Sequence, residues 1–164
     1  MAKKKASKTN ALRLLDQKNI AYKEHTYEWS EDDLSAQHVA AELNQPEEQV
    51  FKTLVTQGNK TGLVVAVIPG NGALDLKKLA QVSGNKKVEM IHMKDLERLT
   101  GYVRGGCSPL GMKKHFPTFI DESAQLYDTI IISAGQRGMQ VELNPIDLAQ
   151  VVSAPFVTIL VEEN

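Results

Sequence analysis

The fold is decided by Val50-Phe-Lys-Thr-Leu-Val-Thr-Gln57, Gly58-Asn-Lys60 and Thr61-Gly-Leu-Val-Val-Ala-Val-Ile-Pro69. The two outer runs are rich in β-branched and other apolar residues, which favour strands. The short Gly-Asn-Lys segment between them is typical of a hairpin turn. The sequence therefore predicts a β-hairpin, and the remaining elements are placed around it.

Cap residues and apolar spacing predict further helices and strands on both sides of this hairpin. We expect helices over about 10–19, 35–43, 76–82, 93–99 and 146–151, and strands over 21–27, 88–91, 118–121, 128–133, 139–143 and 156–161. Because these elements do not alternate regularly, we expect a single α+β domain. Its sheet should be mixed, mostly antiparallel and barrel-like, with surrounding helices. The expected organisation is a flexible basic tail over 1–8 and one domain over 9–164.

Composition excludes several classes of protein. The 164 residues are 42% hydrophobic and 24% charged, close to globular averages. The apolar runs are far shorter than the roughly 20 residues that a membrane span needs, so we expect no membrane partner. The basic residues 1–10 precede no apolar run, which argues against a secretory signal. The single cysteine, Cys107, allows no internal disulfide and no Cys-based zinc site, and we expect a cytoplasmic protein.

Charge is distributed unevenly along the chain, although the net charge is only -1. Residues 77–115 carry nine basic and three acidic side chains, whereas residues 116–164 carry one basic and seven acidic side chains. A cationic middle segment would attract a polyanion. The alternative is that these lysines are scattered over a solvated face.

Lys52 is the first candidate functional residue. Strand alternation places it on the same face as Val50 and Leu54, two apolar side chains. A lysine in such surroundings must reach water, form an ion pair or contact a ligand. An edge-strand lysine that blocks aggregation is the alternative.

Two glycine loops are the next candidates. In Gly105-Gly-Cys-Ser-Pro109, the glycines allow unusual backbone conformations, and adjacent N–H groups could bind an anion or an oxyanion. The segment Ser133-Ala-Gly-Gln-Arg-Gly138 joins two predicted strands. A surface turn and an ordinary hairpin connection are the respective alternatives. Neither loop has the spacing of a phosphate-binding P-loop.

Cys107 invites interpretation as a nucleophile, but nothing in the sequence ties a histidine to it, and a packed thiol is the simpler interpretation. The four histidines show no metal-binding spacing, so we expect neither a metal nor another cofactor.

Three aromatic side chains could stack a base or pack as rim residues, namely Tyr22, Tyr27 and Trp29. Asp147 follows Pro145 in the first turn of a predicted helix, where the helix dipole favours a carboxylate.

At this point the chain resembles a known family over about Thr9–Val161. The resemblance rests on Val50-Phe-Lys-Thr-Leu-Val55, Leu74-Asp-Leu-Lys-Lys-Leu79, Lys86-Lys-Val-Glu-Met90, Thr100-Gly-Tyr-Val-Arg-Gly-Gly-Cys-Ser-Pro-Leu-Gly111, Thr118-Phe-Ile-Asp121 and Ser133-Ala-Gly-Gln-Arg-Gly138. These motifs are similar to those of the YbaK/EbsC family of aminoacyl-tRNA deacylases, which is related to the editing domain of bacterial prolyl-tRNA synthetase.

The resemblance implies a set of site residues. The essential lysine of the family falls on Lys52, and Gly105, Gly106 and Ser108 fall on its catalytic glycine loop. Substrate-binding positions fall on Tyr27, Gly101, Pro109, Ser133, Gly135, Gly138 and Asp147. The family often carries Phe-Gly-Asp-Glu where this chain has Leu34-Ser-Ala-Gln37, so the aromatic wall of the aminoacyl pocket is missing.

The resemblance also implies an activity, which is the removal of cysteine mischarged onto tRNA(Pro), with tRNA(Cys) as a further substrate. The thiol of the substrate would attack its own ester. The expected partners are aminoacyl-tRNA and prolyl-tRNA synthetase. Two alternatives stay open: a deacylase for Ala or Ser on tRNA(Pro), and a non-catalytic module that binds tRNA or protein.

Overall fold

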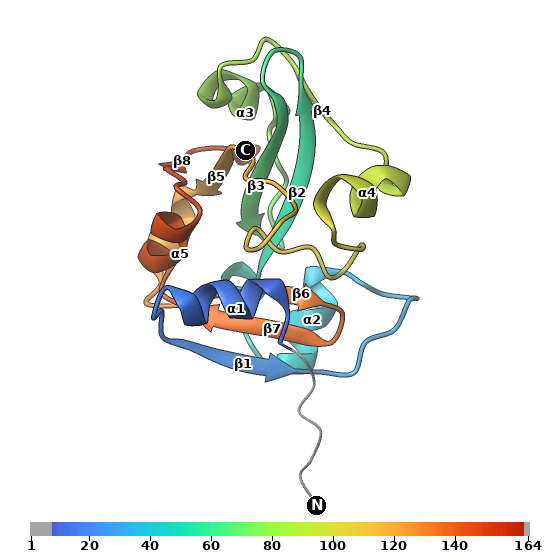
Figure 1. The fold of residues 1–164 in the computed structure, drawn as a ribbon, viewed down its shortest axis with the longest axis vertical. Coiled ribbons are helices and arrows are strands. Elements are labelled where there is room, and N and C mark those ends of the chain that lie inside the picture. Colours follow the sequence, from blue (N-terminus) through green and yellow to red (C-terminus); the bar gives the residue numbers. More distant parts are fainter. Residues whose placement is uncertain (1–7, 163–164) are drawn as a thin grey trace, which may run out of the picture.

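The computed structural model describes residues 8–162 (Figure 1). Residues 1–7, most of the predicted basic tail, lie outside the described part. The predicted hairpin is present as β2 (Phe51–Gly58) and β3 (Gly62–Pro69). The two strands pair antiparallel along their whole length, from Phe51 opposite Pro69 to Gly58 opposite Gly62.

The hairpin is the centre of a five-stranded sheet with the order β4-β2-β3-β5-β8. Strand β4 (Val88–Met90) pairs antiparallel with β2. Strand β5 (Thr118–Asp121) pairs parallel with β3, and β8 (Phe156–Val157) pairs parallel with β5. The sheet is therefore mixed, as the sequence predicts.

A second sheet has three antiparallel strands in the order β1-β7-β6. They are β1 (Tyr22–Thr26), β6 (Ile130–Gln136) and β7 (Met139–Leu143). A parallel bridge between Val50 and Ile131 joins the two sheets at the beginning of β2. The α+β class is confirmed, but the strands of residues 8–162 form two open sheets rather than one barrel-like sheet.

Within residues 8–162, five α-helices and three short 3-10 helices connect and cover the strands. Most α-helices begin at a side-chain cap, because Thr9, Ser35, Asp75 and Asn144 each accept a hydrogen bond from the first turn. The α-helices are α1 (Asn10–Gln17), α2 (Ala36–Leu43), α3 (Leu76–Ser83), α4 (Leu96–Thr100) and α5 (Pro145–Val151). The 3-10 helices are η1 (Glu47–Gln49), η2 (Met93–Asp95) and η3 (Glu122–Leu126).

The predicted last strand over 156–161 is too long, because only Phe156–Val157 form β8. The backbone N–H of Ile159 donates instead to Oδ1 of Asp121, at 3.2 Å. The carbonyl of the same residue accepts from the N–H of Asp75, at 2.8 Å. Within 156–161 only Ile159 is buried, and a side-chain carboxylate takes the place of a strand partner for its N–H.

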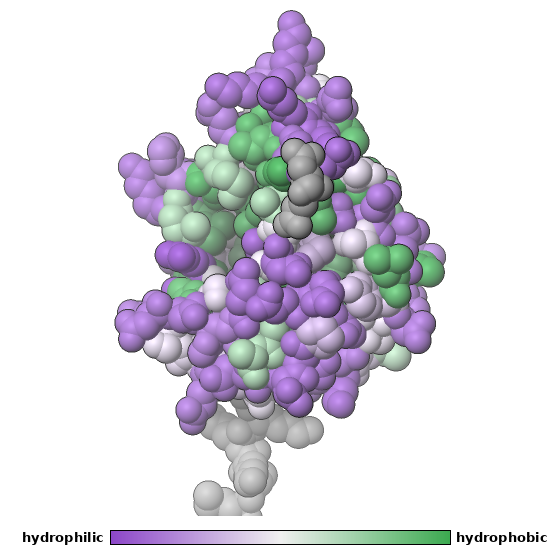
Figure 2. All heavy atoms as spheres, turned by 180° about the vertical axis from the view of Figure 1, so that it is seen from behind, coloured by the Kyte–Doolittle hydropathy of each residue, from purple (hydrophilic) through white to green (hydrophobic). Residues whose placement is uncertain are grey.

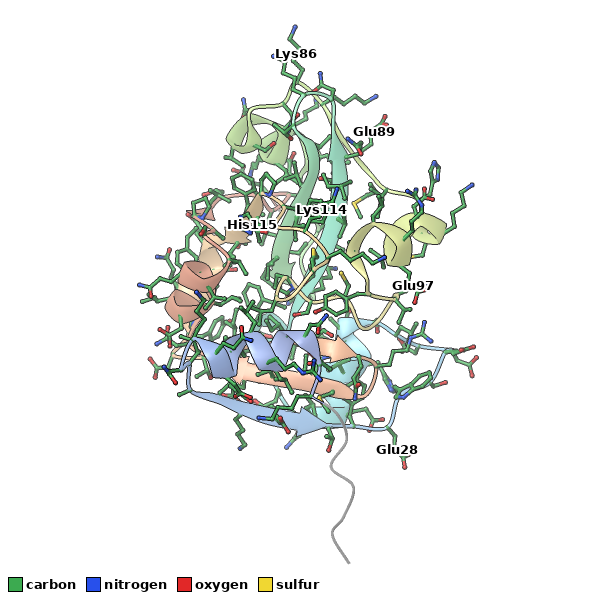
Figure 3. The ribbon with its side chains drawn as sticks, in the orientation of Figure 1. Glu28, Lys86, Glu89, Glu97, Lys114 and His115 are labelled. Atoms are coloured by element: carbon green, nitrogen blue, oxygen red, sulfur yellow. The ribbon has the colours of Figure 1, made fainter. Side chains whose placement is uncertain are left out.

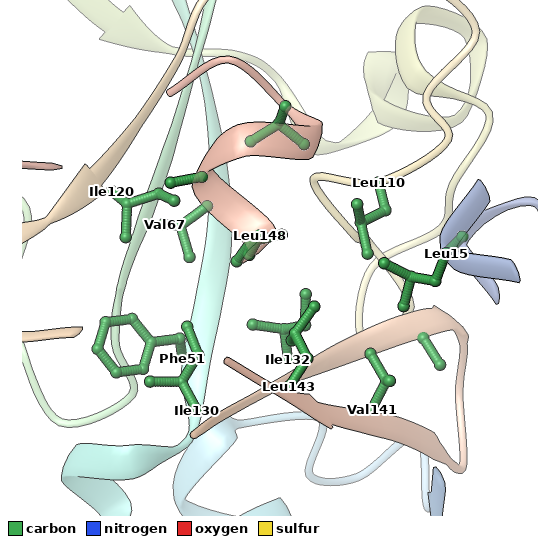
Figure 4. Close-up of a cluster of buried hydrophobic side chains, with 14 of the residues drawn as sticks. Leu15, Phe51, Val67, Leu110, Ile120, Ile130, Ile132, Val141, Leu143 and Leu148 are labelled. Atoms are coloured by element: carbon green, nitrogen blue, oxygen red, sulfur yellow. The ribbon is translucent and has the colours of Figure 1, made fainter. Parts of the chain in front are cut away.

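The main hydrophobic core lies where α1 and α5 meet the three-stranded sheet and the base of β2 (Figure 4). Leu15, Ile132, Leu143 and Leu148 are fully buried within it. A smaller cluster of Val39, Val50 and Ile131 holds α2 against the junction of the two sheets. This small cluster fixes the beginning of β2, the strand that carries Lys52.

Apolar and hydrophilic side chains are unevenly distributed over the surface. Seen from behind, apolar side chains gather in the upper half of the molecule, and hydrophilic side chains dominate the lower half (Figure 2). Met90 and Met93 are among the large apolar side chains that are exposed. No helix in residues 8–162 is both long and apolar enough to cross a membrane.

Candidate active site

A cavity of about 330 Å³ opens at the junction of the two sheets. Its walls come from the start of β2, the beginning of α2, the η2–α4 segment, the first glycine loop and strands β6 and β7. The lining residues are Leu34, Ser35, Ala36, Val39, Val50, Phe51, Lys52, Thr53, Leu54, Met93, Leu96, Arg104, Gly105, Cys107, Ser133 and Gln140. Three of the predicted site residues, Lys52, Gly105 and Ser133, are therefore brought together.

Lys52 projects from β2 into this cavity. Its Nζ donates a hydrogen bond to the carbonyl oxygen of Gly70, at 3.2 Å. None of the salt bridges between residues 8–162 involves Lys52, so the ammonium has no carboxylate partner there. Partial burial lowers the pKa of Lys52 from its ordinary value, because desolvation disfavours the charged form. The cavity thus holds a cation whose charge is available to a ligand.

Gly70 holds the lysine in place and was missed by the sequence analysis. A Cβ at this position would lie 2.5 Å from Cβ of Ala36 and 2.8 Å from the carbonyl oxygen of Val50. Only glycine allows the chain after β3 to pass this close to α2. The Gly70 carbonyl also accepts from Nε2 of Gln37, at 3.0 Å. The Asn-Gly composition of the 70–72 segment indicates a turn, but it does not reveal the close approach.

The first glycine loop contributes Gly105 to the cavity wall. Gly105 has φ +82°, and Leu34 packs directly against it. Gly106 does not line the cavity, and its N–H donates to the carbonyl of Val103, at 2.9 Å. A Cβ on Gly106 would lie 3.1 Å from Cα of Gln136, so this glycine lets the two loops touch. The N–H of Gly106, one of the donors expected to bind an oxyanion, is therefore already hydrogen-bonded within the loop.

Three other predicted residues of this loop lie outside the cavity wall. Ser108 is fully buried, and its Oγ accepts from the N–H of Leu110, at 3.2 Å. Pro109 borders a different hollow. Gly101 ends α4 with φ +90° and lies beside the side chain of Lys113. These contacts stabilise the shape of the loop, and the predicted roles of the three residues toward the substrate stay predictions.

The second glycine loop places Ser133 at the cavity and uses its glycines for packing. The Oγ of Ser133 accepts from the N–H of Gly135, at 3.2 Å, next to an irregularity in the β6–β7 pairing. Gly135, with φ +102°, faces the ring of Tyr102. Gly138, with φ +85°, lies against Trp29. An ordinary hairpin connection thus accounts for the positions of Gly135 and Gly138, whereas Ser133 lines the cavity.

Tyr27 and Asp147 are not among the residues that line the cavity. Tyr27 packs against the cluster of Val39, Val50 and Ile131, one layer behind the wall. Asp147 lies in the first turn of α5, where its carboxylate is favoured by the helix N-terminus. Its predicted contact with the substrate stays a prediction.

Cys107 lines the cavity, but its thiol is a poor nucleophile. Burial raises the pKa of Cys107 to about 12, so the thiol stays protonated at neutral pH. The lining residues include no Asp, Glu or His that could take its proton. Across residues 8–162, no three His, Cys, Asp or Glu side chains gather in a way that could hold a metal ion.

An arginine connects three loops at the rim of the cavity. Nε of Arg137 donates to the carbonyl of Arg104, at 2.8 Å. Its guanidinium lies 5.3 Å from the ring centre of Trp29 and 3.6 Å from a carboxylate oxygen of Glu31. Tyr22 packs elsewhere, on the main core, so the predicted aromatic cluster does not form as a unit.

Other lining residues were missed because no motif marks them. Gln140 lies directly opposite Ser133 in the β6–β7 pairing, and only 4% of it is exposed. Arg104 brings a second cation to the wall, while Leu34 and Met93 supply apolar surface. Leu34 occupies part of the wall where the sequence analysis found an aromatic residue missing. A hairpin between these two strands was one of the sequence-based alternatives, but the register that sets Gln140 opposite Ser133, beside an irregularity in the pairing, was not predicted.

Comparison with known proteins places this fold and cavity in a family. Residues 31–151 match the family described as "Aminoacyl-tRNA editing domain". The chain belongs to this family of editing domains. A relative from Enterococcus faecalis, described as "Putative Cys-tRNA(Pro)/Cys-tRNA(Cys) deacylase EbsC", is 60% identical over 164 residues. The match covers 99% of this chain and 100% of the relative, which confirms the resemblance to the YbaK/EbsC family.

Solved structures agree on the fold. The crystal structure of "a putative trans-editing enzyme for prolyl tRNA synthetase" matches with a TM-score of 0.79 and 21% identity, over 95% of this chain and 100% of that chain. The crystal structure of "hypothetical protein APE2540" matches with a TM-score of 0.85 and 19% identity, over 93% and 100% of the two chains. At these identities the likeness establishes the architecture.

Proposed function

We propose that this chain is a free-standing deacylase that removes cysteine from mischarged tRNA(Pro), and also from tRNA(Cys). Its membership of the editing-domain family supports an aminoacyl-tRNA ester as the substrate. The description of its 60% identical relative supports cysteine as the amino acid. We infer that residues 9–164 form the deacylase domain. Cysteine and proline are both small, and a second hydrolytic site is the usual answer when one pocket cannot separate two such substrates.

The observation that carries the proposal is the chemistry of the cavity wall. It holds two cations, Lys52 and Arg104, and no Asp, Glu or His. Attack by water is normally assisted by a general base, and the wall offers no carboxylate or imidazole for that role. A cysteine thiol has a pKa near 8.5, so about a few per cent of it is thiolate at neutral pH. The substrate therefore brings the nucleophile that the cavity lacks.

The reaction proceeds in two bond changes. The substrate thiolate forms a bond to the ester carbonyl carbon, which places a negative charge on the carbonyl oxygen. The bond from that carbon to the ribose oxygen of the terminal adenosine then breaks, and this oxygen takes a proton from solvent. Cysteine leaves as a thiolactone, which water afterwards opens to free cysteine. Overall, one ester is hydrolysed and no redox partner is needed.

The protein stabilises the charge that develops during this reaction. The Lys52 ammonium faces the cavity without a carboxylate partner in the described chain, so its charge can act on the oxyanion or on the terminal phosphate. The N–H groups of Gly105 and Cys107 form no hydrogen bond with any other described residue, and both residues line the cavity. Prepositioned donors of this kind are the usual source of oxyanion stabilisation.

Basic side chains beside the cavity would meet the RNA backbone. Arg104 lies on the wall, Lys94 follows the lining residue Met93, and Lys113 reaches the end of α4. Figure 3 shows that the cationic segment extends from Lys86, at one tip of the molecule, to Lys114 near its centre, with Glu89 and Glu97 interspersed. Phosphate contacts contribute affinity but little sequence information.

Selection of the correct tRNA therefore needs a partner, and we propose prolyl-tRNA synthetase, which binds the same tRNA. A cytoplasmic location follows from this proposal, because charged tRNA and synthetase meet there.

The test is turnover of tRNA(Pro) charged separately with Cys, Ser, Ala and Pro by the purified full chain. The proposal predicts that Cys-tRNA(Pro) is deacylated far faster than the other three. A preference for Ala or Ser would make the chain a different deacylase that uses water. Binding of charged tRNA without turnover of any of the four would make it a non-catalytic binding module.

A further inference from the structure

Gln140 is the most deeply buried polar side chain that faces the cavity. It lies on β7 directly opposite Ser133 of β6, and both residues line the cavity. Only 4% of Gln140 is exposed, and no hydrogen bond joins its side-chain amide to another described residue. Among the described residues, the enclosed side-chain atom that lacks a partner is Oγ1 of Thr53, so the amide of Gln140 is instead accessible from the cavity. Buried amides are nearly always paired with protein or water. An amide left unpaired at a cavity wall is therefore a candidate contact for a ligand.

The polar groups of the wall show which part of the ligand Gln140 would contact. Lys52 and Arg104 can only donate hydrogen bonds, and they suit the phosphate and the ester oxygens. The Oγ of Ser133 already accepts the N–H of Gly135. Gln140 supplies the one amide or carboxylate oxygen among the lining side chains. The α-amino group is the donor that every aminoacyl ester carries beside its carbonyl carbon, and an amide oxygen can accept from it.

We propose that Gln140 is a specificity-determining residue whose amide oxygen accepts a hydrogen bond from the α-amino group of the substrate. The proposal rests on the proposed deacylase function. Gln140 then restricts turnover to esters of free amino acids, because an acylated amine offers one N–H fewer and adds bulk beside a closely packed strand.

The test combines a change in the protein with a matching change in the substrate. Wild type and Gln140→Leu are each assayed on Cys-tRNA(Pro) and on tRNA(Pro) charged with 3-mercaptopropionate, which keeps the thiol and lacks the amine. For wild type, loss of the amine should lower kcat/KM by about 10- to 100-fold, the range expected when a buried polar group loses its partner. For Gln140→Leu, the two substrates should differ by less than about threefold, because the contact is already absent.

Controls separate a contact from a structural effect. Gln57→Leu makes the same change at an exposed position of β2 outside the cavity wall, and it should keep the wild-type preference for the substrate with the amine. Thermal unfolding of each variant checks the fold, and Gln140→Met serves if Gln140→Leu does not fold. An N-acetylcysteinyl ester on the same tRNA should be a poor substrate for wild type.

The outcomes are distinct. An unchanged preference for the amine in Gln140→Leu and Gln140→Met would overturn the role of Gln140 while leaving the deacylase function intact. Failure of wild type to cleave Cys-tRNA(Pro) at all would instead overturn the proposed function, and the role of Gln140 with it.

Discussion

The ammonium of Lys52 lies 3.2 Å from the carbonyl oxygen of Gly70, and it is held there by a neutral group rather than by a carboxylate. The contact orients the lysine without neutralising it. Because Gly70 is fitted between Ala36 and Val50, the orientation depends on a backbone position that only glycine can occupy. A fixed, unneutralised cation at the wall of a base-free cavity is the feature on which the first three predictions depend.

Replacement of Lys52 by methionine should abolish activity while preserving the fold. Methionine keeps most of the length and the apolar stem, and only the cation is lost. We expect kcat/KM on Cys-tRNA(Pro) to fall by about 10²- to 10³-fold, as when a single oxyanion donor is removed. Lys60→Met, in the exposed turn between β2 and β3, is the matched control and should have nearly wild-type activity. Near wild-type turnover by Lys52→Met would reduce Lys52 to an edge-strand lysine.

The same substitution should reveal the cost of burying the lysine. Burial lowers the pKa of Lys52 in the folded chain below the unfolded value of 10.5. The unfolded chain therefore binds more protons between these two pKa values, so the penalty is complete below the folded pKa and disappears as the pH rises toward 10.5.

Denaturant unfolding should accordingly show that Lys52→Met is at least as stable as wild type at pH 7, with a difference that narrows at pH 10. A difference that widens at high pH would mean that Lys52 is stabilised in its charged form.

Gly70→Ala should destabilise the fold, because its Cβ would lie 2.5 Å from Cβ of Ala36. Overpacking of this kind costs about 1–3 kcal/mol, and we expect the displaced carbonyl to reduce activity as well. The double variant with Ala36→Gly removes one of the two clashing atoms and should recover part of the stability. Equal unfolding free energies for Gly70→Ala and wild type would show that the chain has more room after β3 than the structure indicates.

Cys107→Ala should keep its activity within about tenfold of wild type, since the nucleophile belongs to the substrate. The high pKa of the buried thiol, about 12, leaves it protonated under assay conditions. Removal of a covalent nucleophile costs about 10⁴-fold or more in well-studied enzymes. A loss of that size, measured as kcat on Cys-tRNA(Pro), would replace substrate-assisted cleavage by catalysis through Cys107.

Local signals in the sequence predicted much of the fold. The β2–β3 hairpin and the proline that begins α5 both follow from short-range chemistry, and each is present. The arrangement of the two sheets could not be predicted, because the bridge that joins them is formed by Val50 and Ile131, which are far apart in the sequence. The end of the last strand was missed for a similar reason, since Asp121 supplies the partner of Ile159.

The candidate site was predicted in part. Lys52, Gly105 and Ser133 were found because a lysine on an apolar strand face and glycine loops are visible locally. Ser108 and Pro109 share a motif with Gly105, but they turn away from the cavity. Gln140 and Gly70 belong to the site only through strand pairing and close packing, two properties that no single segment of the sequence encodes.

The measurement that tests the central claim most directly is the ratio of kcat/KM for Cys-tRNA(Pro) and Ser-tRNA(Pro). The two substrates differ by one atom, and pocket fit alone separates such small groups by about 10- to 200-fold. If the substrate thiol is the nucleophile, the ratio should exceed about 10³, because a serine hydroxyl is almost never ionised at neutral pH and the cavity wall offers it no base. Comparable rates on the two substrates would contradict cleavage by the substrate thiol.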